Sequence, residues 1–447
     1  MSHSSSSQSL LREGRKTAWL ALPLVVGQLS HMLMGVVDTV MIGRVGVTEL
    51  AASAFANTLI YIPMMVGIGM SMAVSIRVSQ ARGAKNPPAA RAALRHGLQI
   101  TVVLGVLTLA VATLSVPSLG VFRQPDEVLE AMPGYFRLLA ASMIPAMMSM
   151  AVKNHADAMN RPWPVFWITF GSVLLNALLN WVFIFGKLGA PAMGLEGAGV
   201  ATVLARSVGF AGLIVWCVMG RELREWVPLR WFRAPDWAAV RDLLQVGSPA
   251  SLQLLAEVGA FVAAALFIGT MGETALAAHQ VAITCAGTVF MVPLGISMAL
   301  TVRVGEAWGA DDPGRLRPIV ISGAALALAF TFISASTFLL FNDLIAGWFV
   351  TDPVAREVAA GLLLIAAAFQ LSDMFQIISV GSLRGMSDVK VPAWIAVFAY
   401  WSTIPFGWYL AKRLGYGVDG MWWGITTGLT IAAIALGIRV WRKTRTT

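Results

Sequence analysis

Charged residues are scarce in this sequence. Only 12% of its 447 residues are Asp, Glu, Lys or Arg, whereas 57% are hydrophobic, and the mean hydropathy is +0.74. Soluble globular proteins carry about 25% charged residues, so the composition excludes a soluble enzyme or binding module. Disordered chains are rich in charge and poor in apolar residues, so disorder is excluded as well.

Cysteine is almost absent, and no enzyme signature is found. Cys217 and Cys285 both lie in apolar segments without a metal-binding or redox spacing, so we interpret them as small buried side chains. The sequence contains no HExxH or GxSxG motif and no His/Cys cluster. We therefore predict that the protein is not an enzyme and needs no cofactor other than a coupling ion.

Long apolar runs are the dominant feature. A helix needs about 20 apolar residues to cross the hydrocarbon core of a bilayer, and these runs are apolar on most faces, which favours helices over a barrel. We predict an all-α polytopic membrane protein with twelve transmembrane helices. The predicted spans are 17–41, 51–76, 97–120, 130–152, 163–186, 195–219, 243–269, 274–302, 318–341, 356–383, 391–411 and 417–438.

The basic residues indicate the topology. If the N-terminus is cytoplasmic, 24 of the 32 Lys and Arg residues fall on that side, 6 on the other, and Arg137 and Arg206 inside spans. This asymmetry follows the positive-inside rule and predicts cytoplasmic N- and C-termini in the plasma (inner) membrane. Because the net charge of +9 is spread over many loops and not gathered on one face, nucleic acid is not expected as a partner.

The sequence repeats itself. Residues 42–88 align without a gap with 268–314, and the matched positions include Arg77 and Arg303. An even offset in helix number makes the repeat parallel, and transporters of that plan place their substrate path between the halves. A purely structural pair of bundles is the alternative. The predicted segments are an N-terminal tail 1–16, a first lobe 17–219, a linker 220–239, a second lobe 240–439 and a C-terminal tail 440–447.

Three acidic residues fall inside predicted spans: Asp38, Glu257 and Asp373. A charge deep in a bilayer costs at least about 2.5 kcal/mol and marks a functional pathway by default. In a low-dielectric environment the neutral form of a carboxylate is favoured, so each is a candidate to take up a proton or Na⁺. The alternative is a static ion pair with Arg137 or Arg206.

Other polar residues in the spans are candidates to support these carboxylates. Asn176 and Asn180 lie four residues apart, which places both amides on one helix face, and Thr202 adds a hydroxyl oxygen. Helix–helix hydrogen bonding is the alternative for all three. Further polar residues either line a cavity or bond across helices: His31, His279, Gln280 and Gln376.

These segments resemble the multidrug and toxic compound extrusion (MATE) transporters. The resemblance covers the chain from about Thr17 to Arg439. It is carried by GVVDTVMIGRVG (35–46), ELAASAFAN (49–57), LLNALLNWVFIFG (174–186), GLEGAGVATVLAR (194–206), ALAAHQVA (275–282), MVPLGISMALTVRVGEAWGA (291–310) and QLSDMFQIISVGSLRGMSDVKVP (370–392).

The resemblance implies two six-helix lobes arranged as a V and the export of bulky, often cationic organic compounds in exchange for Na⁺ or H⁺. Asp38, Glu257 and Asp373 match the acidic residues of the NorM-like branch, and Asn180 stands where the DinF type has Asp. Na⁺ is thus expected at Asp38 or at Glu257 and Asp373. We further expect a monomer in the lipid bilayer.

A different carrier of the same superfamily is the alternative function. A lipid-linked saccharide flippase would need a cationic cavity to hold pyrophosphate, whereas only Arg137 and Arg206 fall within spans. A channel would differ from a carrier by passing ion current without substrate exchange. The three carboxylates inside spans favour the antiporter.

Overall fold

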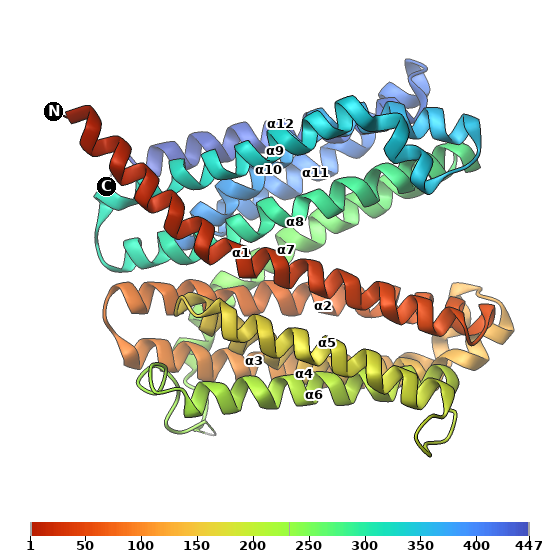
Figure 1. The fold of residues 1–447 in the computed structure, drawn as a ribbon, viewed down its shortest axis with the longest axis horizontal. Helices are drawn as coiled ribbons and strands as arrows, with labels where there is room; N and C mark the ends of the chain where they lie inside the picture. The colour runs from red at the N-terminus through yellow and green to blue at the C-terminus, as the bar shows by residue number, and fades with distance from the viewer. Residues whose placement is uncertain (1, 232, 446–447) are drawn as a thin grey trace. The chain divides into compact units, whose positions relative to one another are not determined.

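The chain folds into helices joined by short turns. The computed structural model describes residues 2–231 and 233–445, with the side chains of residues 2–9 and 31 left out of the description. Within those ranges all regular elements are helical (Figure 1). They are α1 (Ser2–Gly43), α2 (Val47–Gly83), α3 (Pro87–Ser115), η1 (Val116–Phe122), α4 (Asp126–Ala158), α5 (Pro162–Phe185), α6 (Gly194–Met219), α7 (Trp237–Gly269), α8 (Glu273–Gly309), α9 (Pro313–Phe349), α10 (Pro353–Gly385), α11 (Lys390–Trp408), η2 (Tyr409–Arg413) and α12 (Gly417–Lys443).

Local signals set several helix starts. Asn86 precedes Pro87 and accepts a hydrogen bond from the Ala89 amide at 3.2 Å, so it caps α3. Asp352 precedes Pro353 and caps α10 in the same way, with 2.8 Å to the Ala355 amide. A capping side chain satisfies an otherwise unpaired amide, and proline at the first helical position costs no hydrogen bond. Each half thus contains a helix that starts in this way.

The structure repeats as the sequence does. Helices α2 and α8 both have 37 residues, and α4 and α10 both have 33. The turns repeat too, because Lys85 and Asp311, which stand at equivalent positions, have φ angles of 52° and 51°. The predicted all-α architecture of twelve helices with an internal repeat is confirmed.

Eleven of the twelve α-helices in the described chain are long and apolar enough to cross a membrane. The remaining one, α11, has 19 residues, or about 28 Å at 1.5 Å per residue. Its four Trp and Tyr residues lower its hydropathy, yet such residues are typical of membrane interfaces. Many large apolar side chains on the outer helices are exposed, among them Leu114, Phe332 and Phe398. This surface suits lipid and not water.

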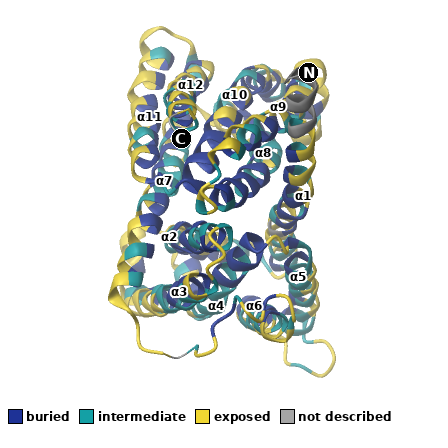
Figure 2. Cartoon of the chain, turned by 90° about the vertical axis from the view of Figure 1, so that its left-hand side faces the viewer, coloured by how far each residue is buried: buried dark blue, intermediate teal, exposed yellow. Residues whose placement is uncertain are grey.

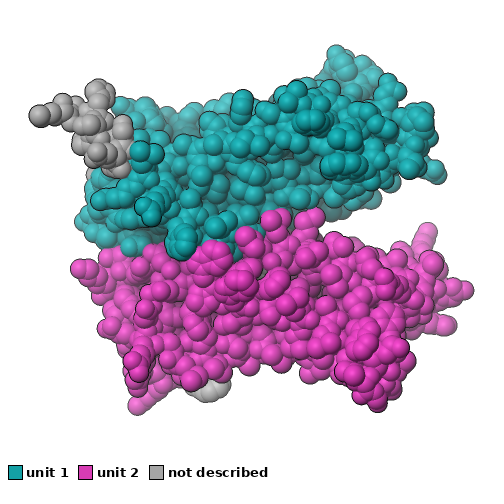
Figure 3. All heavy atoms as spheres, viewed as in Figure 1, with its two compact units in different colours: residues 1–25, 252–447 teal, residues 26–251 magenta. Residues whose placement is uncertain are grey.

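The chain divides into two compact units (Figure 3). Unit 1 comprises Met1–Val25 and Leu252–Thr447, and unit 2 comprises Val26–Ser251. The predicted lobes, 17–219 and 240–439, differ from these units at the first helix of each half. Helices α1 and α7 each contribute their first part to one unit and their remainder to the other.

A buried ion pair explains why α1 begins in unit 1. Glu13 is 2% exposed, and its carboxylate pairs with Arg303 of α8, which is 6% exposed. Arg303 also donates to the Glu13 carbonyl oxygen at 2.6 Å and to the Thr17 hydroxyl. The predicted tail 1–16 is therefore helical from Ser2 and partly packed, and Arg303 is not a loop residue. Both departures follow from one tertiary contact.

Each unit has its own apolar core. In unit 1 the core surrounds Trp422 and Tyr400, and in unit 2 it includes Met132 and Met143. Figure 2 shows α10 mostly buried, whereas outer helices such as α11 carry exposed residues. Helix α10 approaches α8 closely, because a Cβ on Gly381 would lie 2.5 Å from the Ser297 carbonyl oxygen. This contact holds α10 against α8, the helix with which Asp373 shares a cavity.

Candidate cation-binding sites

Asp38 belongs to a chain of polar side chains in unit 2 that joins α1, α5 and α6. Asn180 Nδ2 donates hydrogen bonds to Asp38 Oδ1 at 2.6 Å and to Asn176 Oδ1 at 3.3 Å. Asn176 Nδ2 in turn donates to Thr202 Oγ1 at 3.4 Å. The two amides meet because they stand one turn apart on α5. The structure thus brings together the four residues that the sequence grouped, and we name them the Asp38 site.

The Asp38 site offers oxygen atoms to a small cation. Asn176, Asn180 and Thr202 are buried, and Asp38 is partly buried. Asn180 Oδ1 accepts no hydrogen bond from the described residues. Hard cations prefer carboxylate and amide oxygens, so the residues present fit Na⁺ as well as a proton.

Arg206 already supplies a positive charge to the Asp38 site. It lies one turn beyond Thr202 on α6 and acts electrostatically on Asp38. Its Nη1 donates to Ser142 Oγ at 2.7 Å, and in the described chain it forms no ion pair with a carboxylate. Arg137 is exposed. Arg206 therefore acts on Asp38 without the direct ion pair that the sequence left open.

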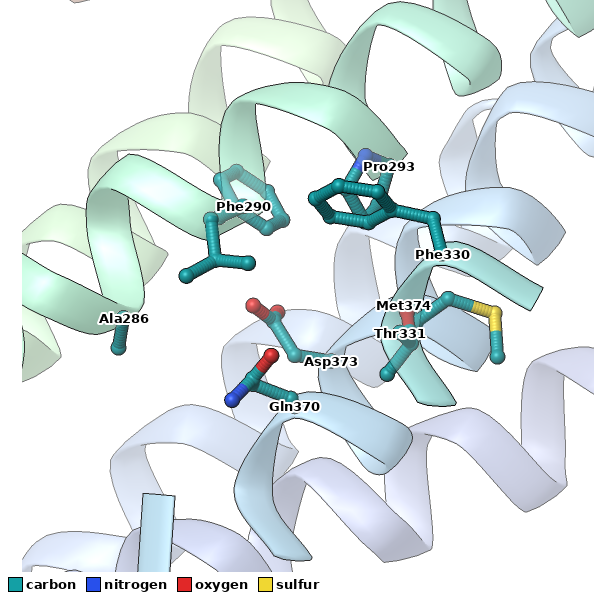
Figure 4. Close-up of a pocket in the computed structure, with 9 residues that line it drawn as sticks. Ala286, Phe290, Pro293, Phe330, Thr331, Gln370, Asp373 and Met374 are labelled. Carbon is teal, nitrogen blue, oxygen red and sulfur yellow. The ribbon is translucent and has the colours of Figure 1, made fainter. Parts of the chain in front are cut away.

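Asp373 forms part of a second site, in unit 1. Its carboxylate and the Gln370 amide project from α10 toward Phe290 and Pro293 of α8 (Figure 4). They line a cavity of about 10 Å³, which is at the lower limit for one water molecule. Gln370 Oε1 accepts from Ser334 Oγ at 2.6 Å, and its Nε2 has no partner in the described chain. The cavity is thus small but polar where Asp373 faces it.

Glu257 of α7 connects Asp373 to a buried arginine. Glu257 is partly buried and acts electrostatically on Asp373. Arg384 and Tyr400 also lie near enough to act electrostatically on Glu257. Arg384 is 5% exposed and donates to Gln253 Oε1, one turn before Glu257, at 3.1 Å. We call Glu257, Asp373 and Arg384 the Glu257–Asp373 site.

Sequence reasoning missed Arg384 and Tyr400. The predicted span 356–383 ends one residue before Arg384, but α10 continues to Gly385 and buries it. The available signal was its spacing, because 11 residues after Asp373 is about three helical turns and therefore the same face. Tyr400 gave no comparable signal, since an aromatic residue in an apolar helix is ordinary.

The other predicted residues do not join either site in the described contacts. Gln376 is fully buried, and neither amide atom has a partner among the described residues. Gln280 is exposed. His279 is buried and accepts a hydrogen bond from Trp422 Nε1 at 3.2 Å. The His31 side chain lies outside the described residues, and cavity lining by His31, Gln280 and Gln376 stays a prediction.

The comparison with protein families identifies the fold. The MatE family profile matches residues 23–182 and 249–409, more than half of the chain. The two matches begin 226 residues apart, which is the offset of the internal repeat. The chain belongs to the MatE family. The MATE resemblance of the sequence is thereby confirmed, and the protein is an integral multi-pass membrane protein of a transporter family.

Relatives match over nearly the whole length. A probable multidrug resistance protein NorM of Xanthomonas campestris pv. campestris is 34% identical over 446 residues, covering 99% of this chain and 97% of the relative. The multidrug resistance protein PmpM of Pseudomonas aeruginosa is 34% identical, covering 95% and 91%. A crystal structure of a MATE protein in the bent conformation has a TM-score of 0.89 at 20% identity, covering 99% and 98%. The last likeness shows the MATE fold alone.

Proposed function

We propose that this MATE protein is a cation-coupled antiporter that exports bulky, often cationic organic compounds by alternating access. Support comes from the NorM and PmpM relatives and from carboxylates held inside membrane-spanning helices. Such groups are costly in a bilayer and are kept where ions or substrates pass. An ion drives the exchange only if it and the substrate favour different conformations of the protein.

The net charge of each site carries the proposal. Glu257 and Asp373 together with Arg384 sum to −1 when all three are ionised, so one monovalent cation neutralises the Glu257–Asp373 site. Asp38 and Arg206 sum to zero without any added ion. A buried net charge is unfavourable, so the Glu257–Asp373 site has the stronger demand for a cation. We assign the coupling Na⁺ or H⁺ to it and a supporting role to the Asp38 site.

The coupling ion and a cationic substrate then compete through charge. With the Glu257–Asp373 site at −1, a cationic compound is attracted to the protein. When Na⁺ or H⁺ binds, the attraction disappears and the compound is released. The flippase alternative receives no support from the buried Arg384, because that cation acts on Glu257 and does not stand free to hold pyrophosphate.

We also propose the plasma (inner) membrane as the location, with both termini cytoplasmic. Helix α1 begins and α12 ends at the same end of unit 1 (Figure 1), and 24 of the 32 basic residues sort to that predicted side. A single chain carries both candidate sites, so a monomer is sufficient for the cycle.

The proposal is tested with purified protein in liposomes. A Na⁺ gradient or a pH gradient is imposed separately, and the transport of ethidium is followed by fluorescence. We expect one of the two gradients to drive exchange and the variants Glu257→Gln and Asp373→Asn to lower its rate at least tenfold. Asp343→Asn, which changes an exposed carboxylate of unit 1, is the matched control. Full exchange in both site variants would refute the assignment, and absence of gradient-driven exchange in the wild type would refute antiport.

A further inference from the structure

Unit 2 contains a cavity beside the Asp38 site. It has a volume of about 150 Å³ and lies among α1, α2, α4, α5 and α6. A buried cavity of about that size binds benzene in an engineered protein, so a single aromatic ring fits. Methionine supplies much of its wall: Met34, Met64, Met143, Met147 and Met150.

The cavity lies one helical turn from the Asp38 site. On α1 it is lined by Met34, four residues before Asp38, and on α6 by Arg206, four residues after Thr202. On α5 it is lined by Ser172, four residues before Asn176. Helices α1 and α5 run away from the predicted cytoplasmic side and α6 runs toward it. Met34, Ser172 and Arg206 therefore all lie on the cytoplasmic side of the Asp38 site. The cavity is therefore a neighbour of the Asp38 site, and Arg206 faces both.

Arg206 gives this apolar cavity an anion-binding group. A guanidinium has five N–H donors, and the described contact of Arg206 is the Nη1 bond to Ser142. Its charge is balanced by Asp38 only at a distance. Lys153, the other cation in the lining, is paired with Asp157 at 2.7 Å. Arg206 is thus the cationic side chain in the lining with donors available to a ligand.

The methionines suit the remainder of such a ligand. Thioether side chains are flexible and adapt to different apolar shapes, and their sulfur atoms make favourable contacts with aromatic rings. A carboxylate binds a guanidinium through paired hydrogen bonds, which are strong when water is excluded. We propose that this cavity binds small aromatic carboxylates of benzoate size, with the carboxylate on Arg206 and the ring among the methionines.

This ligand is opposite in charge to the cationic substrates of the proposed antiport. When an anion occupies Arg206, Asp38 loses its compensating charge and attracts a cation more strongly. By linkage, anion and cation binding in unit 2 therefore reinforce one another. Unit 2 would then take an organic anion together with a cation, independently of the exchange assigned to unit 1.

Equilibrium binding of radiolabelled benzoate to the purified full-length protein tests the proposal. We expect saturable binding that benzamide, the neutral analogue of similar shape, competes at least tenfold less well than benzoate. Arg206→Gln should weaken benzoate binding at least tenfold, and Arg206→Lys should weaken it less. Arg137→Gln, which removes an exposed arginine of the same unit, is the control and should bind within twofold of the wild type.

A second variant keeps the test decisive if Arg206→Gln does not fold. Ala146→Leu fills part of the cavity while keeping Arg206, and we expect it to weaken benzoate binding at least fivefold. The proposal is overturned if wild-type protein binds no benzoate up to millimolar concentration. It is equally overturned if benzamide competes as well as benzoate, or if folded Arg206→Gln and Ala146→Leu both bind like the wild type.

Discussion

The two units differ in how their membrane-embedded carboxylates are compensated by positive charge. In unit 2, one carboxylate sits in a chain of amide and hydroxyl hydrogen bonds and is balanced by Arg206. In unit 1, Glu257 acts electrostatically on Asp373, and Arg384 acts on Glu257. The first arrangement is complete in charge without a ligand, and the second lacks one positive charge. This difference is the basis on which we propose that unit 1 takes up the coupling cation.

This contrast arises on a repeated scaffold. At the 226-residue offset Asp38 corresponds to Ala264 and Glu257 to His31, although α2 and α8 have equal lengths. The 223-residue offset between the starts of α6 and α12 places Leu429 opposite Arg206. Backbone geometry has therefore been kept while the ionisable positions have diverged. The two halves can thus differ in function without a change of fold.

The largest expected effect concerns two ion pairs at equivalent arginines. Arg303 and Glu13 have side chains that are 6% and 3% exposed, whereas Arg77 and Asp242 are 26% and 47% exposed. Removing one partner of a buried pair costs about 3–5 kcal/mol, but an exposed pair contributes about 0–1 kcal/mol. We expect Glu13→Gln to lower the melting temperature by several degrees more than Asp242→Asn, measured by tryptophan fluorescence in detergent. Equal shifts would show that the two anchors are equivalent.

The second prediction concerns a variant that gives the Asp38 site the same net charge as the Glu257–Asp373 site. Asn180→Asp adds a carboxylate beside Asp38, so the Asp38 site would sum to −1. We expect one additional coupling ion to bind per chain, with an affinity at least tenfold above that of the wild-type site. Radiolabelled Na⁺ binding and proton uptake measure the stoichiometry. Asn342→Asp adds the same charge at a partly exposed position outside both sites and should leave it unchanged, so an unaltered count in Asn180→Asp would contradict the charge argument.

A double-mutant cycle tests whether Arg206 balances Asp38. Asp38→Asn and Arg206→Gln each leave one uncompensated charge, so each should destabilise unit 2. The double variant removes both charges and should lose less than the sum, with a coupling energy of about 1 kcal/mol. Thermal unfolding of the four proteins measures it, and Asp38→Asn with Arg137→Gln serves as the additive control. Additivity in both cycles would mean that the two charges act independently.

Much of the fold follows from sequence pattern, because apolar length and charge asymmetry depend on the bilayer and not on tertiary detail. The twelve helices and their repeat follow in this way. Glu13, Arg303 and Arg384 did not, since a charge at a helix end looks the same whether it faces water or a buried partner. Their burial depends on contacts between segments distant in the sequence, such as Arg303 with Glu13.

The candidate sites were predictable to the same extent. Asn176 and Asn180 share a helix face by spacing alone, and a carboxylate inside an apolar run is conspicuous, so the Asp38 site could be grouped in advance. The approach of Arg384 to α7 could not, because α7 and α10 are far apart in the chain and only the fold brings Arg384 to Gln253, one turn from Glu257. Net charge per site is therefore a property of the fold.

The smallest effect should come from Gln376, a buried residue outside both sites. Both of its amide atoms lack partners in the described chain, and an unsatisfied buried polar group costs about 1–3 kcal/mol. Gln376→Leu should therefore leave stability unchanged or raise it by about 1 kcal/mol. Transport separates the two interpretations of this glutamine. If its amide contacts the transported compound, the variant will be stable but impaired in ethidium exchange. Unchanged exchange would instead show that Gln376 only packs between helices and does not line the substrate cavity.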